Sequence, residues 1–380
     1  MSVPAFEPLR SIDEIEAAQW NALAGTHNPF LRHEFLAALE HSGSVGGATG
    51  WQPCYWVLRD EVGLLAALPA WLKSHSWGEF VFDQSWAQFL HQLGKPYYPK
   101  LLVAVPFSPV QGARLLVRRD QQREAVAPDL ALLLQQLVLG NELSSAHVLF
   151  PDAVDQQVLQ QAGWLLRRDC QFHWHNQGYA DFEAYLASFT AEKRKKTRRE
   201  RRRCEEAGIS FQTLSGHDLT PQLLDTVFEL HAATFRQRGN EPYLNRAFFG
   251  EIARTLGDSM MVKLAMQNEQ PVATAVFFWS GEALYGRYWG ALADFHSLHF
   301  ECCYHQGIEF CIEHGIGRFE PGTQGEHKVS RGFAPQYTWS AHFLADPQLR
   351  NAVADFLRRE SESVQAYADE VGTHTPFRRE

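Results

Sequence analysis

The sequence predicts an α/β protein built of two similar halves, each with a mixed sheet flanked by helices. At 380 residues the chain exceeds the size at which a single hydrophobic core usually stops growing. Hydrophobic residues make up 45% of the chain and occur in periodic segments, so a core can form. The same order of helices and short apolar strands occurs twice. We therefore expect halves at 1–180 and 211–380, joined by a basic helix at 181–210.

The first half begins with helical patterns over residues 11–42, which end in an apolar stripe and a glycine stop. Short apolar runs broken by glycine, proline and aspartate follow, and such runs are typical of strands. These expected strands are 55–60, 63–72, 78–82, 100–105 and 113–117. An amphipathic helix at 128–140 and strands at 146–150 and 171–177 complete the half.

The second half repeats this order without a residue-by-residue repeat. Two helices come first, then a hairpin around a short polar turn, a third strand, a helix, and two last strands. The expected helices are 218–239, 245–257 and 300–315, and the expected strands are 261–267, 271–279, 283–291, 317–322 and 336–344.

The joining segment is strongly basic. Residues 193–203 hold nine Lys and Arg side chains and one acid, Glu200, so this stretch is +8 while the remainder of the chain is −17. Like charges at helical spacing repel, so another partner must favour them. One hypothesis is phosphate binding, with candidate residues Lys193, Lys196, Arg198, Arg199 and Arg202. The alternative is a solvated connector, and independent nucleic-acid binding ranks below both because no known nucleic-acid motif occurs.

The sequence also indicates where in the cell the protein is located. The N-terminus has no basic region followed by an apolar run, and no apolar stretch approaches the roughly 18 residues needed to span a bilayer. The six cysteines form no CxxC pair, and a large core needs no disulfides. We expect a cytoplasmic protein with reduced thiols and no membrane insertion.

The stretch RFEPGTQGEHKVSRG, residues 318–332, combines three glycines with many ionisable side chains. Acyl transfer to an amine needs a base near the amine and donors near the developing oxyanion. Glu320, Glu326 and His327 are candidate bases. Lys328 and Arg331, or backbone N–H groups, are candidate anion-binding groups, and Gln324 is a candidate substrate contact. The alternative is a solvated loop, which we rank lower because polar loops fixed by glycine often carry function.

The expected strand at 283–291 carries Arg287, Tyr288 and Trp289. Strand alternation places Arg287 and Trp289 on one face and Tyr288 on the other. We expect Glu320 on the neighbouring strand to partner Arg287. A contact with an acyl donor and a structural ion pair beside a core tryptophan are equally good interpretations.

The expected helix at 300–315 shows Glu301, His305, Glu309 and Glu313 at four-residue spacing. This could be read as a set of metal ligands, but an apolar stripe runs beside it and no HExxH motif occurs. We therefore expect an exposed polar face and no metal.

Four motifs resemble a known family. The segments NPFLRHEFLAALEHSGS, YYPKLLVAVPFSPVQGARLL, LYGRYWG and LHFECCYHQGIEFCIEHGIGRFEPGTQGEHKVSRGFAP are similar to those of predicted bacterial N-acyltransferases related to the FemAB peptidoglycan-bridge enzymes. The resemblance runs from about residue 18 to the C-terminus. It implies two tandem acetyltransferase-like (GNAT) halves and transfer of an acyl or aminoacyl group to an amine, for example on a peptidoglycan-type precursor.

The resemblance also implies where the site lies. The strands carrying Tyr285 to Gly290 and Arg318 to Gly322 would lie side by side and splay apart, leaving a cleft for the donor. The acceptor, a small-molecule or peptide amine, would lie between the halves. Tyr98 and Lys100 match the family pattern and would border the acceptor groove, although flanking prolines also suit a structural turn.

The resemblance implies that the donor is either acyl-CoA or aminoacyl-tRNA. Acetyl-CoA enzymes of this fold follow the first strand of the cleft with a glycine-rich pyrophosphate loop, whereas the segment here, ALADFHSLHFE, contains no glycine. This difference favours the tRNA donor. A competing hypothesis is a non-catalytic protein that uses the same cleft to bind a peptide or cell-wall precursor.

Five tryptophans cluster early in the chain. They are Trp51, Trp56, Trp71, Trp77 and Trp86. An aromatic platform for a sugar or base is one interpretation, but large aromatics on sheet faces are more often core residues.

Overall fold

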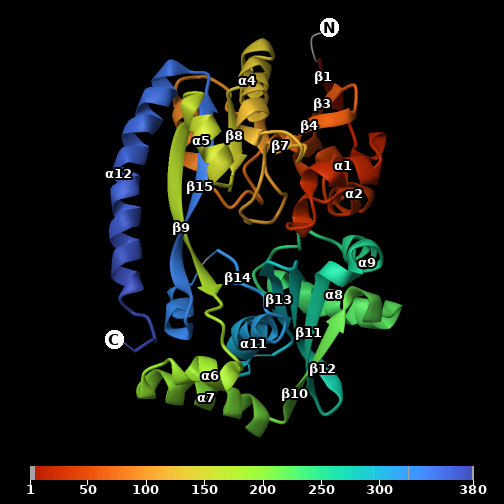
Figure 1. The fold of residues 1–380 in the computed structure, drawn as a ribbon, viewed down its shortest axis with the longest axis vertical. Helices are drawn as coiled ribbons and strands as arrows, with labels where there is room; N and C mark the ends of the chain where they lie inside the picture. The colour runs from red at the N-terminus through yellow and green to blue at the C-terminus, as the bar shows by residue number, and fades with distance from the viewer. Residues whose placement is uncertain (1–4, 294, 324, 379–380) are drawn as a thin grey trace. The chain divides into compact units, whose positions relative to one another are not determined.

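A computed structural model describes residues 5–293, 295–323 and 325–378 of the chain. It confirms the predicted α/β class, because helices pack on sheets that contain both parallel and antiparallel strand pairs (Figure 1). The chain forms two compact units. Unit 1 contains the chain up to Asp169 together with Tyr337–Ala366, and unit 2 contains Cys170–Gln336 and the chain from Tyr367 onward.

These units differ from the predicted halves in two ways. The stretch Tyr337–Ala366 belongs to unit 1 instead of the C-terminal half, because the end of strand β15 pairs with strand β8 there. The basic helix lies within unit 2 and is not a segment outside both units.

Unit 1 contains two sheets. The first has the order β1-β3-β4-β7 and is antiparallel throughout. In the second, β8 pairs with β15 and, in parallel, with β6, which continues to β5 and β2. The strands are β1 Phe6–Leu9, β2 Trp51–Pro53, β3 Tyr55–Asp60, β4 Gly63–Leu68, β5 Ala70–Lys73, β6 Lys100–Val103, β7 Leu116–Val117, β8 Ser145–Leu149 and β15 Ala334–Leu344.

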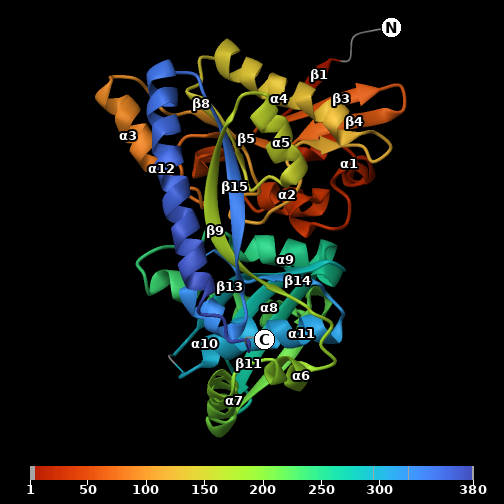
Figure 2. The same ribbon diagram turned by 60° about the vertical axis from the view of Figure 1, so that its left-hand side comes forward.

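The helices of unit 1 begin at conventional signals. Asp152 caps α5 by accepting a hydrogen bond from the Asp155 N–H, and Asn28 caps a short 3₁₀ turn with proline next to it. Helices α4 and α5 lie side by side (Figure 2). The helices are η1 Ile12–Glu14, α1 Ala17–Ala24, η2 Pro29–Leu31, α2 His33–His41, η3 Gly47–Thr49, α3 Gln84–Gln92, α4 Arg123–Gly140, α5 Ala153–Gln161 and α12 Pro347–Gly372, which begins in this unit.

Unit 2 is built on a sheet of order β10-β11-β12-β13-β14-β9, in which only β13 and β14 run parallel. Helix α8 packs against β12 and β13, and α11 packs against β13 and β14. A core of aromatic and aliphatic side chains, among them Trp174, Phe277 and Phe319, fills the unit. The strands are β9 Leu165–His175, β10 Ile209–Ser215, β11 Met260–Gln267, β12 Gln270–Trp279, β13 Ala283–Ala291 and β14 Arg318–Glu320.

The helices of unit 2 follow the predicted order. They are α6 Phe182–Ala187, α7 Ala191–Glu206, η4 Gly216–Asp218, α8 Pro221–Arg236, α9 Arg246–Thr255, η5 Gly257–Ser259, α10 Leu298–Phe300, η6 Glu301–His305, α11 Gln306–Glu313 and η7 Glu326–Arg331. The expected single helix at 300–315 contains a π-helical turn at η6. Such turns are rare and are frequent at functional sites.

Three expected strands differ from the structure. Residues 78–82 form a loop, in which Phe80 has a left-handed backbone (φ 61°). The run 113–117 shortens to β7, because Arg114 is fully buried and its backbone N–H donates to Asp155. Pro69 divides the run 63–72 into β4 and β5, which belong to different sheets.

Candidate active site

The two predicted cleft strands diverge in unit 2. Strands β13 and β14 are in register from Ala283 opposite Arg318 to Tyr285 opposite Glu320. Strand β14 then ends at Glu320, and the next residue, Pro321, has no backbone N–H for a further ladder bond. Strand β13 continues to Ala291 on its β12 side. The divergence opens a cavity of about 80 Å³, and Gly286, Arg287, Tyr288, Trp289, His299, Cys303, Tyr304 and Pro321 are among its lining residues.

A β-bulge places Arg287 at this cavity. Phe277 lies opposite Gly286 and Val276 opposite Tyr288, so Arg287 is an extra residue in β13. Bulges bend a strand and redirect side chains. The residue is half-buried and lines the cavity.

The aromatic residues after the bulge point to opposite faces, as predicted. The Tyr288 ring contacts His231 and Phe249, on α8 and α9, at centroid distances of 5.0 and 5.5 Å. The Trp289 ring contacts His299, on α10, at 5.3 Å.

The carboxylate of Glu320 acts on two arginines, Arg287 and Arg318. Glu320 is 1% exposed, and its Oε1 accepts a hydrogen bond from Arg318 Nε at 3.0 Å. Burial lowers the pKa of Arg287, while the charge of Glu320 opposes that shift. The predicted pairing of Glu320 with Arg287 is therefore present as an electrostatic interaction, and Arg318 provides the direct hydrogen bond.

Lys328 lies within η7 and is only 2% exposed. Its Nζ donates to the carbonyl of Gly322 at 2.7 Å. Burial, together with the nearby charge of Arg287, lowers the pKa of Lys328 to about 7. A lysine in this state is only partly protonated at neutral pH.

Two of the predicted bases, Glu326 and His327, are exposed. His327 Nε2 lies 2.9 Å from the hydroxyl of Tyr304, and Tyr304 lines the cavity. Burial, followed by the charges of Arg331 and Lys328, lowers the pKa of His327 below its ordinary value. Burial raises the pKa of Tyr304, so its phenol stays neutral. The pair therefore connects a neutral imidazole to the cavity through a hydroxyl group.

Arg331 points to the basic helix. Its Nη2 and Nε donate to Glu200 at 2.7 and 3.2 Å, and His305 Nε2 lies 3.2 Å from the same carboxylate. Burial alone would raise the pKa of Glu200, but His305 and Arg331 outweigh it and lower the pKa. The guanidinium also lies over the Phe300 ring. The predicted anion-binding role of Arg331 is corrected here, because this side chain is already held by Glu200.

The predicted exposed face of the 300–315 helix is also corrected. Glu301 and His305 are 2% and 1% exposed. Arg201 of α7 reaches Glu301 at 3.3 Å and Glu309 at 2.9 Å. The acidic residues face the basic helix, which explains their spacing. Within the described ranges, no group of three or more His, Cys, Asp or Glu side chains could hold a metal ion.

The outer face of α7 remains cationic. Lys196, Arg198, Arg199 and Arg202 are exposed, as is Lys195, while Lys193 is half-buried. Arg198 forms an ion pair with Glu183, and both side chains are exposed. The candidate phosphate-binding side chains are thus presented on a helix whose other face is fixed by Glu200 and Arg201. Gln324 lies outside the described residues.

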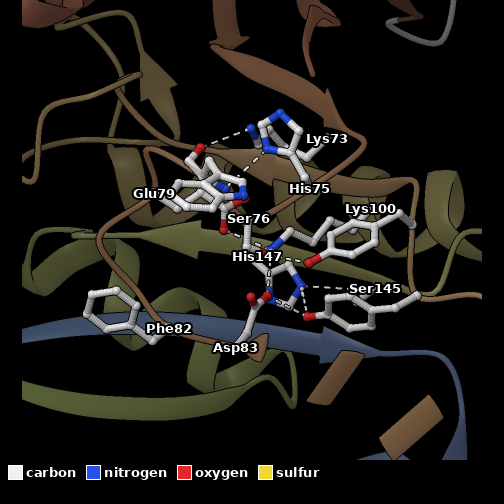
Figure 3. Close-up of polar contacts among 12 residues, drawn as sticks. Lys73, His75, Ser76, Glu79, Phe82, Asp83, Lys100, Ser145 and His147 are labelled. Atoms are coloured by element: carbon white, nitrogen blue, oxygen red, sulfur yellow. Dashed lines mark hydrogen bonds and ion pairs between the residues drawn. The ribbon is translucent and has the colours of Figure 1, made fainter. Parts of the chain in front are cut away.

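The residues predicted to border the acceptor groove belong to a buried cluster in unit 1. Figure 3 shows Lys100 surrounded by Ser76, Glu79 and Asp83. The Lys100 side chain is 0% exposed and donates to both Ser76 Oγ and Glu79 Oε2 at 2.8 Å. The predicted groove role of Lys100 is wrong for this reason. Tyr98 is half-buried, and its hydroxyl lies 2.8 Å from Ser76 Oγ.

Most of the early tryptophans are core residues, as the favoured interpretation held. Trp51, Trp71 and Trp86 are buried and Trp56 is half-buried, whereas Trp77 is 67% exposed.

Sequence reasoning missed the residues that complete the cavity and its supports. His299, Cys303 and Tyr304 line it, and Glu200 orients Arg331. In the sequence, Tyr304 falls in the apolar stripe of the helix expected at 300–315, and no sequence signal marks the π-helical turn that carries it. The isolated Glu200 among nine basic residues was the one available signal.

None of the helices in the described part of the chain combines the length and apolar character needed to cross a bilayer.

Several solved structures of known proteins are similar to this chain. FemX has a similar structure, with a TM-score of 0.56, 10% identity, and coverage of 92% of this chain and 100% of FemX. L-PGS from Bacillus licheniformis gives a TM-score of 0.50 at 11% identity, covering 85% of this chain and 94% of that one. A tandem GNAT protein from the clavulanic acid biosynthesis pathway gives 0.46 at 13% identity, covering 91% and 99%.

A search of curated proteins found no match. The model of the FemAB-like family, described as peptidoglycan biosynthesis/recognition, matches residues 11–379. This match spans nearly the whole chain and agrees with the motifs from which the resemblance was drawn. The chain belongs to the FemAB-like family.

Proposed function

We propose that the protein is an N-acyltransferase that moves an acyl or aminoacyl group to an amine in the cleft of unit 2. The observation that carries this proposal is the cavity at the divergence of β13 and β14, where Arg287 and Tyr304 meet and His327 lies behind Tyr304. Membership of a family described by peptidoglycan biosynthesis/recognition supports a peptidoglycan-type precursor as the acceptor.

The groups around the cavity suit the chemistry of acyl transfer. The donor carbonyl would sit near Arg287 and Lys328, whose positive charges would stabilise the oxyanion that forms when the amine attacks. The tetrahedral intermediate then collapses, and the leaving group departs with the bond to the carbonyl carbon broken. A partly dry site strengthens these charge interactions.

Proton removal from the attacking amine is assigned to the Tyr304–His327 pair. The hydroxyl would accept the proton from the amine and pass its own proton to His327 Nε2, 2.9 Å away. Because the pKa of His327 lies below its ordinary value, the imidazole is neutral and able to accept a proton at neutral pH. Glu320 is held by Arg318, and Glu326 is exposed, so we rank both below His327.

Aminoacyl-tRNA is the donor that the residues favour over acyl-CoA. The segment after β13 contains no glycine before the helical stretch that begins with α10. A backbone cradle for a pyrophosphate needs small residues that let N–H groups approach the phosphates. The exposed cations of α7 would meet the phosphates of a tRNA instead.

The test is a transfer assay with the full-length protein. Radiolabelled aminoacyl-tRNA pools and, separately, acetyl-CoA are supplied with a lysine-containing muramyl peptide, and mass spectrometry identifies any new amide. We expect a product that disappears in Tyr304→Phe and His327→Ala but persists in Glu326→Gln, the exposed neighbour. Tight binding of the peptide without any product from either donor would support the non-catalytic alternative.

A further inference from the structure

Glu200 is the one acidic residue in the basic segment 193–203, and it lies on the inner face of α7. Together with Thr197 and Cys204 it forms the buried stripe of this helix, at spacings of three and four residues. Its side chain is 8% exposed. A carboxylate is rarely buried unless it is paired. The partners of Glu200 therefore show what this buried charge does.

The two oxygens of Glu200 bind side chains from two different elements of unit 2. Oε1 accepts a hydrogen bond from Arg331 Nη2 at 2.7 Å, and Oε2 lies 3.2 Å from both Arg331 Nε and His305 Nε2. Arg331 is the last residue of η7, and His305 is the last residue of the π-helical turn η6. One carboxylate of α7 therefore connects these two elements to each other.

The same two elements carry the Tyr304–His327 pair. Tyr304 directly precedes His305 in the π-helical turn, and it lines the cavity. His327 lies four residues before Arg331 in η7, and Arg331 Nη1 donates to the His327 carbonyl oxygen at 2.8 Å. Each member of the pair is thus connected to Glu200, Tyr304 through His305 and His327 through Arg331.

His327 is an exposed residue, so burial does not fix the position of its imidazole. Its backbone is anchored through Arg331 instead. The carbonyl of Arg331 accepts a hydrogen bond from the Tyr185 hydroxyl at 2.7 Å, and its guanidinium lies 3.5 Å from the centre of the Phe300 ring. Proton transfer between Tyr304 and His327 needs both groups held in position, and a small displacement is costly.

We propose that Glu200 is a positioning residue for the Tyr304–His327 pair. It acts through Arg331 and His305, and it keeps η7 and η6 at the separation that allows the hydrogen bond between Tyr304 and His327. Only the use of this pair as a proton path rests on the proposed function. The positioning itself is a property of the free protein and needs no turnover.

The alternative is that Glu200 only balances the charge of the buried Arg331. Its loss would then lower the stability of the protein without changing the geometry at His327. The tautomer of His327 separates the two roles. In the proton path Nε2 accepts the proton of the Tyr304 hydroxyl, so the ring proton of the neutral imidazole must lie on Nδ1.

The experiment is an NMR measurement of the ring nitrogens of His327 in the full-length protein with ¹⁵N-labelled histidine, at a pH where the imidazole is neutral. His327→Ala assigns the signals, and Tyr304→Phe is the reference for a broken pair. We expect the Nδ1–H tautomer in the unchanged protein. Folded Glu200→Gln should shift towards the Nε2–H tautomer, as Tyr304→Phe does.

Two further variants make this test decisive. Arg331→Lys should fold even if Glu200→Gln does not, because it keeps a cation beside Glu200. It loses the fork that also reaches the His327 carbonyl, so it should change the tautomer in the same way. Glu309→Gln is the matched control, since Glu309 pairs with α7 through a different arginine, Arg201, at 2.9 Å. That control should leave the tautomer unchanged.

Two spectra would overturn the proposal. One is a spectrum of His327 in folded Glu200→Gln or Arg331→Lys that matches the unchanged protein. The other is an unchanged protein that already holds the Nε2–H tautomer.

The transfer assay separates this inference from the proposed function. Glu200→Gln should lower kcat about ten-fold or more with little change in KM, because the loss comes from a displaced pair. Adding Glu200→Gln to Tyr304→Phe should lower kcat little further, and an additive loss would overturn the positioning role. If neither donor gives a product while the His327 tautomer still depends on Glu200, the proposed function fails and the positioning role stands.

Discussion

Two buried lysines, one in each unit, show how the same side chain can be a fixed charge or a titrating group. Lys100 of unit 1 is fully buried, and its ammonium donates to Ser76, Glu79 and Asp83 (Figure 3). Burial alone would lower its pKa, but Asp83 and Glu79 outweigh burial and raise it. Lys328 of unit 2 has one carbonyl acceptor and a cationic neighbour, so its pKa falls to about 7.

The difference teaches that burial does not identify a functional lysine, whereas the number and charge of its acceptors do. An ammonium has three donors, and Lys100 has three oxygen partners. Such a group is a structural support, here for the loop Ser74–Asp83 between β5 and α3. Lys328 donates to one carbonyl oxygen in the described part of the chain and lies near Arg287 and Cys303, which line the cavity. A lysine with a shifted pKa at a cavity is a candidate functional residue.

The largest expected effect on stability comes from removing the fixed charge of Lys100. Lys100→Met should destabilise the protein by about 3–5 kcal/mol, because it leaves Glu79 and Asp83 buried without their cation. Chemical denaturation monitored by tryptophan fluorescence measures the change. Lys95→Met is the matched control, since Lys95 is 49% exposed and pairs with Asp346 at the surface. That control should lower the free energy of unfolding by about 1 kcal/mol or less. Equal losses in the two variants would show that the buried ion pairs of Lys100 contribute no more than a surface pair.

The second effect is on transfer activity. Tyr304→Phe and His327→Ala should each lower kcat about 100-fold, equivalent to about 2.7 kcal/mol, because each interrupts the same proton path. The double variant should lose little more than either single variant. In the unchanged protein the rate should hold through neutral pH and fall only below the ordinary pKa of histidine, since that of His327 is lowered. Additive losses would contradict a shared path.

The third effect is on the pH dependence of stability. The pKa of Lys328 is about 7 in the folded protein and 10.5 ordinarily. Between these values the unfolded chain holds a proton that the folded chain lacks, so stability rises with pH. Lys328→Met should reduce that slope by up to about 1.4 kcal/mol per pH unit. Lys73 contributes a similar slope but is present in both proteins, so it cancels in the difference.

The pKa of Lys100 shifts in the opposite direction from the pKa of Lys328. Its pKa is raised in the folded protein, so its stabilisation is present below the ordinary lysine pKa and is lost only above it. A Lys100 variant that still folds should therefore leave the slope between about pH 7 and about pH 10 unchanged. Chemical denaturation at several pH values measures the stability of both variants. If the Lys100 variant changed the slope of stability against pH as much as Lys328→Met does, the two lysines would not differ as described.

The smallest effect on stability is expected on the outer face of α7. Replacing Lys195, Lys196, Arg199 and Arg202 by Gln should change stability by about 0.5 kcal/mol or less, because these side chains are exposed and mutually repulsive. The same variant should bind tRNA more weakly and with a shallower salt dependence. Glu200→Gln tests the inner face and should destabilise the unit far more. Unchanged tRNA binding in the quadruple variant would leave α7 as a connector only.

Much of the fold could be predicted because apolar periodicity and turn residues act locally. The strands around Met260–Gln267 and Gln270–Trp279 and the helix Pro221–Arg236 are of this kind. The loop at 78–82 could not be predicted as a loop. Its apolar letters resemble a strand, and what bends it is Lys100, which binds Glu79 and Asp83 from another strand.

The sequence predicted which residue types form the candidate site, but not which side chains they contact. The motif at 318–332 and the residues Arg287 and Lys328 meet at the cavity through the parallel pairing of β13 and β14. Arg331 could not be assigned from sequence, because its partner Glu200 lies 131 residues away. Tyr304 was unpredictable for another reason, since its approach to His327 depends on a π-helical turn.

The most direct test of the contrast between the units is an NMR titration of lysine ¹³Cε and ¹⁵Nζ signals in the full-length protein. Lys328→Arg and Lys100→Arg assign the two signals. The expected result is that Lys328 titrates near pH 7 while Lys100 stays protonated past the ordinary lysine pKa. A Lys328 signal that titrates with the exposed lysines would contradict the account, because Lys328 would then carry an ordinary fixed charge, as Lys100 does.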